Sequence, residues 1–147
     1  MDKEKLVKEL MLDEGVVYEI YRDHLGYPTF GVGHLITEKD EEWGLAVGTP
    51  IPKKRVLECL DKDIEIVCTE LDKNMKWWKE LDDVRQRVLA NMAFNLGLPR
   101  LSKFVNFLTA VQDSNWEKAA DEMMDSKWAN QVGDRAVRLS KKMLEGE

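Results

Sequence analysis

The segment most informative about the fold is YRDHLGYPTFGVGHL, residues 21–35. In the longer stretch from Tyr18 to Thr37, Tyr, Ile, Thr, Phe and Val predominate, and Gly26, Gly31 and Gly33 interrupt it, which is typical of short antiparallel strands joined by tight turns. The tetrapeptide Asp23-His24-Leu25-Gly26 has the composition of the first of these turns. We therefore expect a small twisted antiparallel sheet over residues 18–37.

The segments on either side predict helices. Residues 53–74 carry apolar side chains at helical spacing, and residues 84–96 are so apolar that we expect a buried central helix, capped by Asp82 or Asp83. Residues 38–52 are polar and then rich in Gly and Pro, which indicates a loop. Further helices are expected over residues 3–13, 76–81, 102–112, 115–124 and 134–144. The class is α+β, mostly α.

The length of 147 residues suits one domain with two unequal lobes. We expect a β-containing lobe over about 14–60 and a helical lobe over about 75–147 that also takes the N-terminal helix. The helix over about 53–74 would connect them. This organisation corresponds to a single domain over residues 1–147.

Composition excludes several classes of protein. With 44% hydrophobic residues the chain is not disordered, and no apolar run approaches the ~20 residues that span a bilayer. The net charge is −6, and the basic excess is confined to residues 74–104 and 126–147, so binding to nucleic acid is disfavoured. We expect those two basic segments to present a positive face to a polyanionic partner. Two cysteines make no disulfide framework, and we expect Cys59 and Cys68 to be reduced.

Two carboxylates stand out by their context. Glu14 lies in the last turn of the first helix, where the negative end of the helix dipole favours the neutral, proton-donating form. Asp23 lies on a polar turn, where it can stay ionised. Two carboxyls in different environments are what glycosidases use, and Thr29 in the same sheet could hold a water. Without further context, two solvated surface carboxylates would be the simpler interpretation.

Further motifs supply that context. Three motifs resemble those of the phage-type lysozymes, which are endolysins of glycoside hydrolase family 24. They are Asp13-Glu14-Gly15, Ile20-Tyr21-Arg22-Asp23 and the run from Gly26 to Leu35. The resemblance continues at residues 91–97, 116–120 and 126–131. It covers roughly residues 6–141, except for residues 36–52, which match poorly.

The resemblance implies an enzyme that cleaves the β-1,4 bond between N-acetylmuramic acid and N-acetylglucosamine in peptidoglycan, with inversion. Glu14 would be the general acid, Asp23 the second carboxylate and Thr29 the residue that positions water. Leu35 and Phe94 match substrate-contact positions, although Phe94 could equally be core. The resemblance implies no metal and no cofactor, a cleft between the lobes and, we expect, a monomer that does not insert into membranes.

Two positions depart from the family pattern, and one lies outside it. Phe107 stands where a small hydroxyl residue is common, and Glu122 where an amide is. Trp43 lies in the poorly matched loop and could contact sugar or wall, whereas the other four tryptophans lie in segments where packing is expected. His34 is expected to be a hydrogen-bonded histidine at the lobe junction rather than a metal ligand, because no Cys or His spacing fits a zinc site.

The N-terminal residues bear on where the protein is located. Met1 to Lys5 is charged and leads into no apolar segment, so we expect accumulation in the host cytoplasm and release through a separate membrane pore. The chief alternative is a catalytically inactive peptidoglycan-binding or structural domain of the same fold. A third is an unrelated helical interaction protein.

Overall fold

The computed structural model describes residues 1–147 and confirms the expected α+β, mostly α class. Its contacts group into two compact units. We call residues 3–66 the sheet unit, and residues 67–147 together with Met1 and Asp2 the helical unit. None of the helices combines the length and the apolar character needed to cross a membrane.

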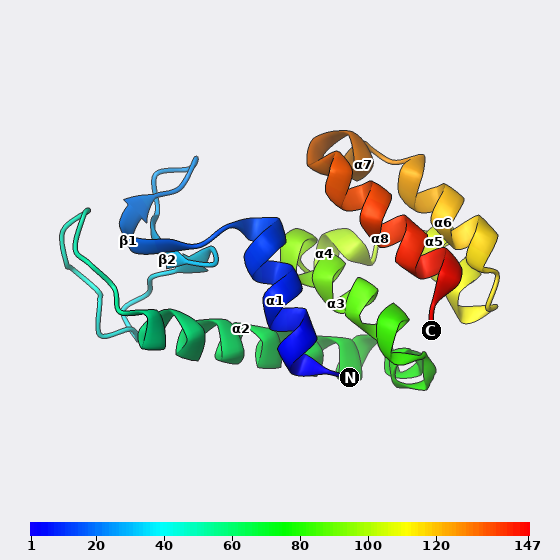
Figure 1. Ribbon diagram of the computed structural model, residues 1–147, viewed down its shortest axis with the longest axis horizontal. Helices are drawn as coiled ribbons and strands as arrows, with labels where there is room; N and C mark the ends of the chain where they lie inside the picture. Colours follow the sequence, from blue (N-terminus) through cyan, green and yellow to red (C-terminus); the bar gives the residue numbers. More distant parts are fainter. The chain divides into compact units, whose positions relative to one another are not determined.

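The sheet unit contains α1 (Lys3–Glu14), the strands β1 (Val17–Arg22), β2 (Pro28–Gly31) and β3 (His34–Leu35), and the first part of α2 (Lys53–Asn74; Figure 1). The three strands are antiparallel in the order β1-β2-β3, as the sequence predicts. The loop that follows them returns along β1, because Ile20 exchanges backbone hydrogen bonds with Gly48 and Thr49.

The same loop is anchored to α2 by an ion pair. Arg55 donates to both carboxylate oxygens of the buried Glu42, from Nε at 2.8 Å and from Nη2 at 2.9 Å. Bidentate pairs of this kind fix orientation as well as position. The poorly matched segment is therefore held in a defined place within the sheet unit.

The helical unit is built around α3 (Asp83–Leu96). This helix is buried along most of its length, and Val88, Leu89 and Met92 are fully enclosed, as expected of the central helix. Asp82 caps it by accepting a hydrogen bond from the backbone N–H of Arg85. The other elements of the unit are η1 (Lys76–Glu80), α4 (Leu98–Leu101), α5 (Val105–Gln112), α6 (Trp116–Met124), α7 (Lys127–Val132) and α8 (Asp134–Glu145). Of these, α6 and α8 lie side by side (Figure 1).

Three features differ from the sequence-based expectations. The helix expected over 102–112 is α5, which begins three residues later at Val105, and neither α4 (Leu98–Leu101) nor α7 was expected. By contacts, α1 groups with the sheet unit rather than with the later helices, and one reason is that Lys3 pairs with Asp61 and Glu65 of α2.

The expected basic face is wrong in part. Arg85, Arg87 and Arg135 are only 9%, 6% and 6% exposed. Arg85 pairs with Asp82 and Arg87 with Asp83, while Arg135 donates to the Asn91 side chain. These three cations are buried and bonded inside the helical unit. The number of basic residues in the sequence therefore overstates the positive charge on the surface of this unit.

Candidate active site

Asp23 occupies the turn between β1 and β2 in a geometry that its own carboxylate stabilises. Its Oδ1 accepts hydrogen bonds from the backbone N–H groups of Leu25 and Tyr27, both at 2.9 Å. Gly26 closes the turn with an N–H bond to the Asp23 carbonyl at 2.9 Å, and its φ of 86° is one that glycine adopts without strain. The expected Asp23–Gly26 turn is confirmed, and it leaves Asp23 Oδ2 without a hydrogen bond inside the protein.

Glu14 is the last residue of α1 and is exposed. Its position can be judged from Tyr21 on β1. Burial, followed by the negative charges of Asp23 and Glu14, raises the pKa of the Tyr21 hydroxyl. Both carboxylates therefore lie close enough to act on one phenol, which sequence reasoning had not singled out. The alternation of β1 could have drawn attention to Tyr21, because a residue two positions before Asp23 shares its side of the strand.

Thr29 lies beside Tyr21 in the sheet. The register pairs Tyr21 with Thr29 across β1–β2 and Thr29 with Leu35 across β2–β3, so the three side chains share one face. Thr29 is only 3% exposed and donates its hydroxyl hydrogen to the Tyr27 carbonyl at 3.0 Å. Its oxygen lone pairs can therefore accept a hydrogen bond from another molecule. Leu35 is 47% exposed and could contact a ligand on this face.

His34 is a hydrogen-bonded histidine, as expected. Its Nδ1 lies 2.8 Å from Asp63 of α2, and its Nε2 lies 3.1 Å from Asp40 in the following loop. The hydrogen bond to Asp63 raises the pKa of His34, and burial opposes this only in part. The imidazole therefore ties β3 to both α2 and the loop within the sheet unit.

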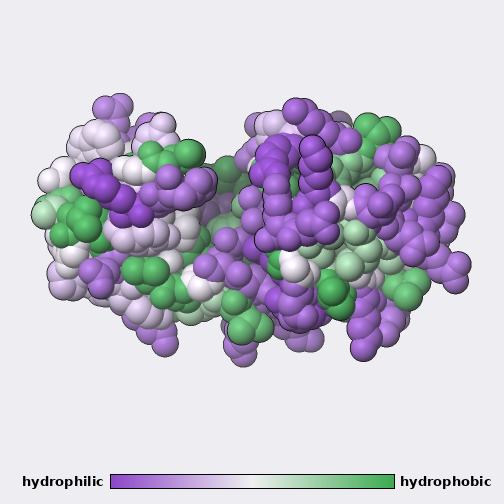
Figure 2. All heavy atoms as spheres, turned by 90° about the horizontal axis from the view of Figure 1, so that it is seen from above, coloured by the Kyte–Doolittle hydropathy of each residue, from purple (hydrophilic) through white to green (hydrophobic).

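Trp43 lies on the anchored loop and is 56% exposed. It lines a surface pocket of about 460 Å³, together with Arg22, Leu45 and Val47. Figure 2 shows hydrophobic groups in green on the surface of this unit. Since Arg22 immediately precedes Asp23, this pocket adjoins the turn that holds the second carboxylate. Contact between Trp43 and sugar stays a prediction.

The remaining expected contacts lie in the helical unit. Phe94 is half-buried and lines a pocket of about 220 Å³ with Glu70 and Pro99. Phe107 is buried and lines another pocket of about 190 Å³ together with Glu122. The two positions that depart from the family pattern are thus neighbours. Substrate contact by Leu35 or Phe94 stays a prediction.

The amino-acid sequence is similar to those of known proteins. The family model described as phage lysozyme matches residues 12–143, which is most of the chain. The chain belongs to the phage lysozyme family. Membership of that family makes it a glycoside hydrolase, the muramidase class of enzyme.

The chain is also similar to a lysozyme of comparable length and to parts of two longer phage proteins. Probable T4-type lysozyme 1 of Dictyostelium discoideum is 31% identical over 88% of both chains. The pre-baseplate central spike protein Gp5 of Enterobacteria phage T4 is 30% identical over 96% of this chain, and the match spans only 28% of that protein. The peptidoglycan hydrolase gp36 of Pseudomonas phage phiKMV is 30% identical, and the match spans 15% of it. In the last two, the similar region is a small part of a longer chain.

Proposed function

We propose that this lysozyme hydrolyses the β-1,4 bond between N-acetylmuramic acid and N-acetylglucosamine in bacterial peptidoglycan. The observation that carries the proposal is that the negative charges of Glu14 and Asp23 both raise the pKa of the Tyr21 hydroxyl, so the two carboxylates lie near the same side chain. The Asp23 carboxylate is also held in place by two backbone N–H groups. The similarity to a relative named as a peptidoglycan hydrolase supports the choice of substrate.

Each side chain has a distinct part in the proposed reaction. Glu14 gives its proton to the oxygen that leaves C1 of the muramic acid residue. A water attacks C1 from the opposite face and loses its proton to Asp23. The backbone donors at Asp23 Oδ1 orient this carboxylate so that Oδ2 can accept that proton.

Thr29 supports the same water in this proposal. Because its hydroxyl hydrogen is committed to the Tyr27 carbonyl, the Thr29 oxygen acts as an acceptor toward the water. Two acceptors, Thr29 and Asp23, would turn a water lone pair toward C1. Attack by a free water inverts the anomeric configuration, and we propose inversion for this enzyme.

Analysis of the products tests the bond and the stereochemistry. Purified peptidoglycan is digested, reduced with borohydride and hydrolysed. A muramidase converts muramic acid to its reduced form, whereas a glucosaminidase converts glucosamine. The α-anomer should appear first in an NMR time course. Release of reduced glucosamine alone would overturn the assigned bond.

The alternative is a wall-binding domain without activity. The presence of Glu14, Asp23 and Thr29 together argues against it, and binding to walls without release of soluble fragments would support it.

Release from the host cytoplasm through a separate membrane pore is part of the proposal. It predicts that wall lysis by expressing cells requires a second, pore-forming protein.

A further inference from the structure

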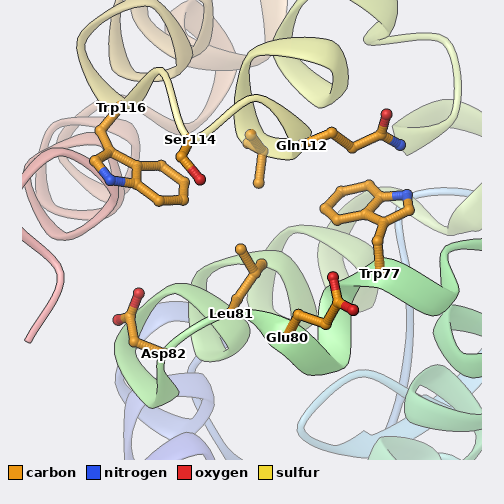
Figure 3. A pocket seen from close by; sticks show the side chains of 8 residues that line it. Trp77, Glu80, Leu81, Asp82, Gln112, Ser114 and Trp116 are labelled. Carbon is orange, nitrogen blue, oxygen red and sulfur yellow. The ribbon is translucent and has the colours of Figure 1, made fainter.

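A further pocket in the helical unit is lined by two tryptophans. Two half-buried tryptophans, Trp77 at η1 and Trp116 at the start of α6, face each other across it (Figure 3). Their six-membered rings point into the pocket, and the indole N–H edges point away from it. The pocket is about 240 Å³, below the ~300–1,000 Å³ of sites for larger ligands, so it suits a single ring.

Four polar side chains line this pocket. Gln112 and Ser114 come from the α5–α6 corner, Glu80 comes from η1, and Asp82 comes from the cap of α3. Gln112, Ser114 and Glu80 are exposed, whereas Asp82 pairs with Arg85, and the Glu80 carboxylate lies next to Trp77 in Figure 3. An amide, a hydroxyl and a carboxylate that line a pocket with two aromatic rings combine hydrogen-bonding groups with flat apolar surfaces. A pyranose ring presents the same combination, with hydroxyls around its edge and C–H groups on its faces.

The orientation of Trp116 is fixed by Arg85. The guanidinium carbon lies 3.7 Å from the centre of the indole ring. Arg85 is itself held by the Met143 carbonyl at 2.7 Å, the Leu144 carbonyl at 3.0 Å and the Asp82 carboxylate at 3.0 Å. A ring that is already immobilised loses little entropy when a ligand packs against it.

Ser114 is the only residue other than glycine with a positive φ, at 56°. It follows α5, where its N–H bonds to the Val111 carbonyl at 3.0 Å and the N–H of Asn115 bonds to the Ala110 carbonyl at 2.8 Å. This pattern is the Schellman motif, in which glycine is the usual residue at the position of Ser114. The serine accepts backbone strain that glycine would avoid, and its side chain lines the pocket.

We propose that this pocket binds a neutral N-acetylhexosamine ring of the cell-wall glycan, as an accessory site separate from the catalytic carboxylates. The inference rests on the proposed function for the identity of the glycan. A neutral sugar is favoured over an anionic one because Glu80 would repel a negative charge. A second binding site on a polymeric substrate raises the effective concentration of enzyme at the wall.

Binding can be measured without catalysis. Diacetylchitobiose is titrated into the ¹⁵N-labelled protein, and the indole N–H resonances of Trp77 and Trp116 are followed. We expect saturable shifts of both in the wild type, and an affinity about tenfold weaker in Trp77→Ala. Glu80→Gln should also weaken binding, whereas the matched control Glu117→Gln, an exposed glutamate outside the pocket, should not.

Ser114→Gly separates a binding role from a structural one. Relief of the positive φ should raise the unfolding temperature, while loss of the hydroxyl should weaken chitobiose binding. Trp77→Ala should slow lysis of insoluble walls severalfold and leave the turnover of soluble oligosaccharides unchanged.

The proposal is overturned if the indole resonances do not shift at millimolar sugar, or if Ser114→Gly and Trp77→Ala bind as the wild type does. Binding of tetramethylammonium without binding of chitobiose would also overturn it, in favour of a cation site. Failure of the proposed function looks different: walls stay intact with the wild type, whatever the titration shows.

Discussion

Replacement of Asp23 by asparagine and by alanine separates the turn from the chemistry. Asparagine keeps an oxygen at the position of Oδ1, so the N–H groups of Leu25 and Tyr27 retain their acceptor. Alanine removes that acceptor and leaves both N–H groups to water. Neither variant carries the negative charge that the proposed reaction needs at this position.

The structure sets the size of the two effects. A hydrogen bond to a charged acceptor contributes about 1.5–3 kcal/mol, but this turn is partly exposed and water replaces much of what is lost. We expect Asp23→Ala to lower the free energy of unfolding by about 2 kcal/mol, or the melting temperature by about 4–8 °C. Asp23→Asn should cost less than about 1 kcal/mol. Both should lower the rate of wall lysis by ~10²-fold or more.

Thermal unfolding by circular dichroism and the turbidity of a wall suspension measure these effects side by side. The reasoning is refuted if Asp23→Asn lyses walls within a few-fold of the wild-type rate. Equal destabilisation by asparagine and alanine would refute the account of the turn instead. Asp121→Asn, at an exposed position of α6, is a matched control for the change of charge.

Three other predictions follow from the core, the histidine and the net charge. Leu89→Ala should cost about 2–5 kcal/mol in chemical denaturation, because Leu89 is fully buried and its truncation leaves a cavity; a cost below about 0.5 kcal/mol would show that α3 is not the central buried helix. His34→Asn should be most destabilising at pH values below the ordinary histidine pKa of 6.5, because the hydrogen bond to Asp63 raises the pKa of His34 in the folded state and the stabilisation is lost as pH rises through that pKa; a constant difference in melting temperature from pH 5 to 9 would contradict this. With a net charge of −6, lysis of polyanionic walls should accelerate as ionic strength rises from about 0.01 M to about 0.15 M and the Debye length shrinks from about 30 Å to about 8 Å; a monotonic fall from the lowest salt would count against the charge argument.

Local signals in the sequence account for the elements that were predicted well. The helix over 53–74 begins just after Pro52 and has the bounds expected, because its apolar spacing is regular over its whole length. Asp82 caps α3 as its residue type suggests. The turn at Asp23 was predictable because glycine and aspartate each have a defined place in tight turns.

The missed helices have physical reasons. Gly97 and Pro99 follow α3 and together indicate the end of a helix, but Pro99 also lies in the first turn of α4, where proline needs no N–H partner. α7 has only six residues, too few for a periodic pattern, although Ser126 caps it by accepting from the Ala129 N–H. A serine at that spacing was the one available signal.

Charge was the least predictable property. Arg85, Arg87 and Arg135 were counted as surface cations, but burial depends on contacts between elements distant in sequence, such as Arg85 with the end of α8. Tyr21 was missed for a similar reason. The effect of Glu14 and Asp23 on the Tyr21 pKa depends on how α1 is placed against β1, and no local sequence pattern predicts that placement.

The central claim is that Glu14 delivers the proton that breaks the glycosidic bond. Its most direct test is the initial rate of wall lysis by Glu14→Gln beside Glu4→Gln, a matched change at the other end of α1. We predict a loss of at least ~10²-fold for Glu14→Gln, a wild-type rate for Glu4→Gln, and equal melting temperatures for both. Lysis by Glu14→Gln within a few-fold of the wild type would contradict the account.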